Sequence, residues 1–400
     1  MSKRKAFVIA YWAVVALAAL IIVNLIGKMG FSWIIMGLIV GAGAGISIYK
    51  SFKDEGYIKS TLAINKSNRI LSFDYLRCLA VIFVIGLHTL QVDNGLHPEL
   101  EGTALYSVFR YLGLFFIACN LLYVMISGGL LLPYKEESLS HFYLKRLTKI
   151  IIPLVVYYLF CLWQAEQFKV LTAREILFKI LRADTPEAPQ LWMIYTIISV
   201  YLAIPFLRFM LKDMPYKFVA AFVVINLVFI TIARCWPGLL GFSMPLAGWI
   251  GIAIAGYFMT LEDTRKYDNV IITLGIIAAI GTGLVIKFVP TYQIILGNTS
   301  PFPALTSMAF FAIAFKFKDK LKDLYIIRLI SKYSYGIILL HWWSLNAVTR
   351  LHFNLSAFDF YGFGAVISAV VTLAVSLVAA YLIDNLCIVI SELLYKIFHL

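Results

Sequence analysis

Apolar segments long enough to cross a membrane recur along the whole chain. A membrane-spanning helix needs about 20 predominantly apolar residues, because the hydrocarbon core is about 30 Å thick. The composition agrees, since 62% of the 400 residues are hydrophobic and only 14% are charged. In soluble domains roughly 45–50% of the residues are apolar and about 25% are charged. We therefore predict an all-α, polytopic membrane protein with about twelve spans, near residues 6–27, 31–49, 72–91, 106–132, 149–164, 190–211, 217–234, 242–260, 269–289, 302–316, 333–350 and 362–390.

The basic residues indicate how these spans are oriented. Short cytoplasmic loops carry an excess of Lys and Arg. If the N-terminus is cytoplasmic, most of the 34 basic residues fall on inner loops. Both termini are therefore expected to be cytoplasmic. The net charge of +13 is then explained by topology and by contact with anionic membrane lipids, and nucleic acid is not an expected partner.

The domain boundaries follow from the same pattern. Residues 1–50 hold two spans, and the first is expected to be a retained anchor because no clear small-residue cleavage site follows it. Residues 51–71 form a basic cytoplasmic linker, and residues 72–400 form a domain of ten helices. No metal is expected, because no His, Cys and carboxylate residues show ligand spacing.

One predicted span carries three ionisable residues, Asp74, Arg77 and His88. Ionisable groups inside a membrane are costly and almost always face the bundle interior or a wet cavity. At 100° per residue all three fall on one narrow stripe of a helix, and Arg77 and His88 are separated by roughly 16 Å along the axis. The spacing predicts a polar stripe that faces a cavity, with Asp74 and Arg77 toward the cytoplasm.

The segment SFDYLRCLAVIFVIGLH, in which ten residues separate Arg77 from His88, resembles the first core helix of the acyltransferase-3 family of integral membrane O-acyltransferases. The resemblance covers about residues 68–390. Four further segments match later landmarks of the family in the expected order: VMISGGLLL at 124–132, FYLKRLTKIIIP at 142–153, LWMIYTIISVYLAIPFL at 191–207 and ISKYSYGIILLHW at 330–342.

This resemblance implies transfer of an acyl group, usually acetyl, from cytoplasmic acetyl-CoA or another acyl-CoA to a hydroxyl of an extracytoplasmic glycan or lipid-linked sugar, at the bacterial cytoplasmic membrane. His88 is the expected general base, because histidine titrates nearest neutral pH; a transient acyl-histidine is the alternative. Arg77 is expected to bind a CoA phosphate, with Asp74 orienting its guanidinium. Lys145 and Arg146 suit the remaining phosphates.

Four other residues are candidates for the substrate cavity, each with a structural alternative. His341 either lines the cavity or makes a helix–helix hydrogen bond, and Tyr335 lines the cavity or shapes a kink. Trp192 either anchors its span at the interface or stacks on a sugar. Arg110 lies near the outer end of its span. Its candidate partners, one of which could also orient His88, are Asp93, Glu99 and Glu101.

The segment Ser127-Gly128-Gly129 has two interpretations. Ser127 is a candidate for binding the acyl donor, whereas the two glycines allow helices to pack closely. For the whole chain, the rival function is a proton-coupled secondary transporter of a small solute, which would also use intramembrane Asp, Arg and His residues. The sequence shows no internal symmetry of the transporter kind. Binding and slow hydrolysis of acetyl-CoA would separate the two functions.

Overall fold

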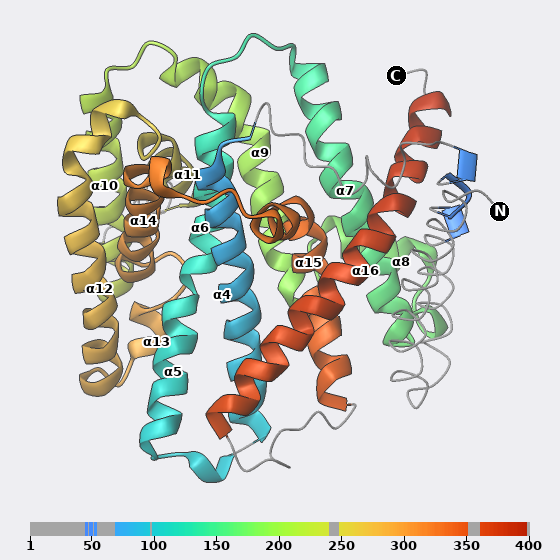
Figure 1. Cartoon of the computed structure of the whole chain (residues 1–400), viewed down its shortest axis with the longest axis horizontal. Helices are drawn as coiled ribbons and strands as arrows, with labels where there is room; N and C mark the ends of the chain where they lie inside the picture. The colour runs from blue at the N-terminus through green and yellow to red at the C-terminus, as the bar shows by residue number, and fades with distance from the viewer. Residues whose placement is uncertain are drawn as a thin grey trace. The chain divides into compact units, whose positions relative to one another are not determined.

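The computed structural model describes residues 45–46, 48–50, 52–53, 69–96, 98–239, 248–350 and 361–397. Within these residues the chain consists of helices, turns and loops and has no strand, which confirms the all-α prediction (Figure 1). The chain divides into two compact units. One, called here the Arg77 unit, comprises Asn68–Leu144 and Tyr195–Ser331; the other, the His341 unit, comprises Met1–Ser67, Lys145–Ile194 and Lys332–Leu400.

Six helical segments among the described residues are long and apolar enough to cross a membrane. Helices Trp249–Phe258 and Pro301–Lys316 are apolar but shorter. The predicted spans 6–27 and most of 31–49 lie outside the described residues, so the count of twelve spans, the orientation and the domain boundaries stay predictions. The six segments are Leu71–Val92, Ala104–Leu131, Pro189–Leu211, Tyr216–Cys235, Glu262–Phe288 and Phe363–Asp384.

The Arg77 unit is a bundle built around α4 and α6. Helix α4 contacts α5 and α6, α6 contacts α11, and α12 contacts α14; Figure 1 shows α4 beside α5 and α6. The helices that lie wholly in this unit are α4 (Leu71–Leu96), α5 (Ala104–Phe116), α6 (Ala118–Leu131), α10 (Tyr216–Cys235), α11 (Trp249–Phe258), α12 (Asp268–Phe288), α13 (Tyr292–Ile295) and α14 (Pro301–Lys316). Short 3-10 turns occur at Pro98–Leu100, Glu262–Tyr267 and Lys318–Lys320.

Two aromatic groups fix the position of α4. Phe73, near its N-terminal end, packs edge-on against Phe311 and Phe315 of α14. Phe83, about three turns further along, packs against Phe116 at a ring separation of 4.8 Å. Aromatic pairs of this kind add roughly 0.5–1.5 kcal/mol beyond the area they bury. They hold α4 against α14 and against the end of α5.

Small residues let α6 and α11 approach at backbone distance. A Cβ atom at Gly128 would lie 1.8 Å from the carbonyl oxygen of Ala253, and one at Gly256 would lie 2.0 Å from that of Met125. Neither backbone can move without separating the helices. The close-packing interpretation of Gly128 is therefore confirmed, and it agrees with the role of small residues between membrane helices.

We expect Gly128→Ala to destabilise the folded protein by about 1–3 kcal/mol, because the added methyl forces α6 and α11 apart. Gly113→Ala is the matched control in α5, since its Cβ would meet only a Leu87 methyl at 4.0 Å and removing a helix-interior glycine is favourable. Thermal unfolding of the purified proteins in detergent measures the difference. Equal midpoints for both variants would refute the backbone contact.

The His341 unit contains α8 (Ala173–Leu181), α16 (Tyr361–Ile397) and parts of three helices that continue from the other unit: α7 (Leu139–Gln164), α9 (Trp192–Leu211) and α15 (Tyr325–Arg350). Tyr335 Oη of α15 donates to the Ile150 carbonyl of α7 at 2.8 Å. A Cβ at Gly336 would lie 2.7 Å from the Ala380 Cβ, so α15 and α16 also pack closely.

An ion network orders the segment that leads into α9. Lys179 Nζ of α8 lies 3.3 Å from Asp184 Oδ2 and 3.2 Å from Glu187 Oε1. Burial lowers the pKa of Lys179, but hydrogen bonds and charge from Glu187 and Asp184 outweigh it and raise the pKa above its ordinary value. Buried Tyr158 donates its hydroxyl to the Asp184 carbonyl. The network holds the loop that ends at Trp192.

Candidate functional site

The polar stripe predicted for α4 begins at a charged cluster around Asp74. The Asp74 carboxylate is 1% exposed, and its Oδ1 lies 3.8 Å from Arg77 Nη1 and 3.4 Å from Arg69 Nη2. Ser331 Oγ of α15 donates to the same oxygen at 2.5 Å and accepts a hydrogen bond from Arg77 Nη1 at 3.5 Å. We call Arg69, Asp74, Arg77 and Ser331 the Asp74 cluster.

The Asp74 cluster has the charge expected of an anion-binding group. Two guanidinium groups share one carboxylate, so the formal charges leave one positive charge in excess. The Arg69 and Arg77 side chains are 23% and 27% exposed, whereas Asp74 is buried beneath them. Guanidinium groups held in this way present paired N–H donors that match a phosphate. The structure thus pairs Asp74 with Arg77, and it adds Arg69 and Ser331, which the sequence pattern does not single out.

His88 lies further along α4, where its ring is half-buried. Its Nδ1 is 3.0 Å from Gln91 Oε1 on the next turn of the same helix. With the amide oxygen as acceptor, the neutral ring carries its proton on Nδ1, and Nε2 is the ring atom with the lone pair. Gln91 is thus a partner of His88 that the structure shows, and a loop carboxylate that also orients His88 stays a prediction.

The loop carboxylates predicted as partners of Arg110 are Asp93, Glu99 and Glu101. The side chain of Asp93 lies outside the described part of the chain, and Glu99 and Glu101 are exposed in the segment before α5. Arg110 instead lies over two aromatic rings, 5.9 Å from the Tyr106 centroid and 5.5 Å from the Tyr292 centroid. Its buried Nε has no hydrogen-bond partner among the described residues. A loop carboxylate as the partner of Arg110 stays a prediction.

Helix α6, which packs against α4, carries Ser127. Ser127 Oγ donates to the Tyr123 carbonyl of its own helix at 3.0 Å. This bond uses the hydroxyl proton, so Ser127 can act toward a ligand as an acceptor. The residues of α6 from Ala118 to Ile126 are buried. Tyr123 is among them, although its hydroxyl has no hydrogen-bond partner within the described ranges.

The remaining predicted residues belong to the His341 unit. His341 is fully buried in α15, and its Nδ1 is 2.6 Å from the Ile338 carbonyl oxygen. The bond from Tyr335 to α7 favours a structural role for its hydroxyl. Trp192 is 37% exposed at the start of α9. Lys145 is exposed and Arg146 is half-buried in the second turn of α7. Their roles toward a ligand stay predictions.

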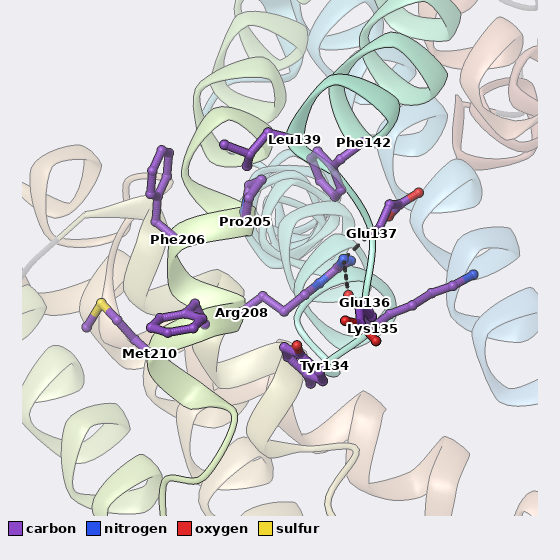
Figure 2. A pocket seen from close by; sticks show the side chains of 11 residues that line it. Tyr134, Lys135, Glu136, Glu137, Leu139, Phe142, Pro205, Phe206, Arg208 and Met210 are labelled. Carbon is purple, nitrogen blue, oxygen red and sulfur yellow. Dashed lines mark hydrogen bonds and ion pairs between the residues drawn. The ribbon is translucent and has the colours of Figure 1, made fainter.

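A pocket of about 470 Å³ lies where α6 ends, α7 begins and α9 ends, and Figure 2 shows its lining. Buried Arg208 crosses it (Figure 2). Its Nε and Nη2 donate to the Leu131 carbonyl at 2.9 and 2.7 Å, and its Nη1 lies 3.4 Å from Glu137 Oε2. In the sequence, Arg208 is only one of many charges that indicate topology. Its contacts show that it caps α6 at the Leu131 carbonyl, one of the C-terminal carbonyls that lack intrahelical partners.

The fold and the site define an all-helical membrane protein whose first core helix carries a charged cluster and a histidine on one stripe. The class is that of membrane acyltransferases: the model of the acyltransferase-3 family, described as an acyltransferase domain, matches residues 70–384. This match covers most of the chain, which therefore belongs to the acyltransferase-3 family. The searches of curated proteins and of solved structures gave no significant match. Among the described residues no group of three or more His, Cys, Asp and Glu side chains could hold a metal.

Proposed function

We propose that this acyltransferase moves an acetyl group from cytoplasmic acetyl-CoA to a hydroxyl of an extracytoplasmic glycan or lipid-linked sugar, at the bacterial cytoplasmic membrane. The observation that carries the proposal is the arrangement on α4. A guanidinium pair suited to phosphate lies at one end, and His88, whose Nδ1 lies 3.0 Å from Gln91 Oε1, is roughly 16 Å away along the axis. The donor's charged nucleotide and the acceptor's hydroxyl thus have separate partners on one helix.

Each residue then has a defined role in the reaction. Nε2 of His88 takes the proton of the acceptor hydroxyl, which makes the oxygen a competent nucleophile toward the thioester carbonyl. The C–S bond breaks as the C–O bond forms, and the CoA thiolate leaves with the proton returned from the imidazolium. The Asp74 cluster holds the diphosphate of CoA, because a free acyl-CoA carries too much charge to enter hydrocarbon.

Acetyl-CoA binding by the purified protein tests the proposal first. The proposal predicts binding of acetyl-CoA and slow release of CoA in the absence of a glycan, both measured in detergent. A secondary transporter would do neither. Mass spectrometry of surface glycans from deletion and complemented strains then identifies the acyl group and the acceptor. Unchanged glycans in the deletion strain would contradict an envelope acceptor.

A further inference from the structure

Tyr123 of α6 carries a buried hydroxyl without a hydrogen-bond partner in the described part of the chain. Its side chain is 8% exposed, and its Oη makes no hydrogen bond to any described residue. Leaving such a group unbonded in an apolar interior costs about 1–3 kcal/mol. Neighbouring polar groups of α6 do find partners: Asn120 Nδ2 donates to Asn298 Oδ1 at 2.7 Å, and Ser127 bonds its own helix.

The contacts between α4 and the α5–α6 segment fix the level of Tyr123. A Cβ at Gly129 would lie 3.0 Å from the Phe73 ring, and a Cβ at Gly86 would lie 2.8 Å from the Phe116 ring. The two segments therefore run antiparallel, and interpolation between these contacts places Tyr123 level with Leu79. That level is roughly 3 Å beyond Arg77 toward His88, and roughly 14 Å short of His88.

The proximity of Tyr123 to Arg77 agrees with this placement. The two groups are near enough for the ionised form of one to influence the other. Tyr123 thus lies near the level of the Asp74 cluster, displaced along α4 toward His88. A donor whose diphosphate is held at Arg77 and whose thioester reaches His88 must pass this level with its pantetheine arm.

We infer that the Tyr123 hydroxyl donates a hydrogen bond to an amide carbonyl of the pantetheine arm of the acyl donor. The inference rests on the proposed function. The chemistry matches, because a buried amide without a partner costs free energy just as the buried hydroxyl does. One bond between the two removes both penalties. Tyr123 is then a donor-binding residue that selects a thioester with an amide-containing arm.

Tyr123→Phe tests the inference, because it removes the hydroxyl and keeps the ring. We expect it to raise the Kd for acetyl-CoA about threefold to tenfold, the range of one neutral hydrogen bond. Affinity for adenosine 3′-phosphate 5′-diphosphate, which lacks the arm, should not change. The thermal midpoint of the ligand-free variant should be equal to that of the wild type or higher, because the unbonded hydroxyl is gone.

Tyr111→Phe is the matched control, since Tyr111 Oη donates to the Ala279 carbonyl at 3.1 Å. It should lower the thermal midpoint and leave acetyl-CoA affinity unchanged. Equal acetyl-CoA affinity in wild type and Tyr123→Phe would overturn the inference and leave the proposed function intact. A fall in the midpoint of Tyr123→Phe, or its failure to accumulate in the membrane, would overturn the inference as well, by showing that the hydroxyl is bonded in the folded protein. If the wild type itself bound no acetyl-CoA, the proposed function would fail first.

Discussion

His88→Ala is expected to lower the rate of acyl transfer by about 10²–10⁴-fold, the usual contribution of a positioned general acid–base group. The substitution removes the proton acceptor without interrupting α4, so membrane insertion and abundance should not change. His88 Nδ1 lies 3.0 Å from Gln91 Oε1. Gln91 is exposed, so the loss of this bond leaves no buried polar group without a partner. Transfer of labelled acetyl from acetyl-CoA to the glycan, at matched protein abundance, measures the effect.

Two variants make the His88 result specific. His141→Ala removes a histidine that is 61% exposed in α7 and lies 3.5 Å from Glu137, and it should retain near wild-type transfer. Gln91→Leu keeps the imidazole but removes the acceptor for Nδ1–H, so a smaller loss of rate is expected. A His88→Ala variant that transfers acetyl at the wild-type rate would remove His88 from the reaction.

Arg77→Ala is expected to weaken acetyl-CoA binding by roughly 10- to 100-fold, because hydrogen bonds to charged groups contribute about 1.5–3 kcal/mol. Arg77→Lys should lose less, since it keeps the charge but not the two-pronged fork of donors. Asp74 keeps Arg69 and Ser331 as partners in both variants, so the buried carboxylate is not left alone and the fold should persist. Isothermal titration calorimetry measures the three affinities.

A control outside the site is Arg174→Ala, on exposed residue Arg174 of α8, whose guanidinium lies 5.5 Å from the Phe178 ring centroid. Its affinity for acetyl-CoA should equal that of the wild type. The same comparison on Arg146 tests the basic segment at the start of α7, where a smaller loss is expected. If wild type, Arg77→Ala and Arg77→Lys bound acetyl-CoA equally, Arg77 would be a structural partner of Asp74 and nothing more.

The features that the sequence could predict depend on residues that lie close together in the chain. A run of about 20 apolar residues indicates a membrane-spanning helix, because its length matches the hydrocarbon thickness. The approach of Asp74 to Arg77 follows from their three-residue separation, and the same rule identifies Gln91 as a partner of His88. A search for charged partners alone misses Gln91, because its side-chain amide is neutral.

Contacts between distant segments could not be predicted in this way. Ser331 bonds Asp74 although it is 257 residues away in sequence, and only the folding of its unit brings the two residues together. The charge pattern marks Arg208 as one of many inner-loop charges, but the structure buries it against the end of α6. The closeness of α6 to α11 likewise depends on a carbonyl of Ala253 that no residue pattern identifies.

The sidedness of the reaction tests the central claim most directly. Purified protein is reconstituted into vesicles, and one orientation is selected by protease accessibility of the loop before α7, near Lys135. Labelled acetyl-CoA is supplied only on the face of that loop, and the glycan acceptor only on the opposite face. We predict transfer of label to the acceptor across the bilayer, abolished by His88→Ala. Transfer that required acetyl-CoA and acceptor on the same face would contradict the transmembrane route from Arg77 to His88.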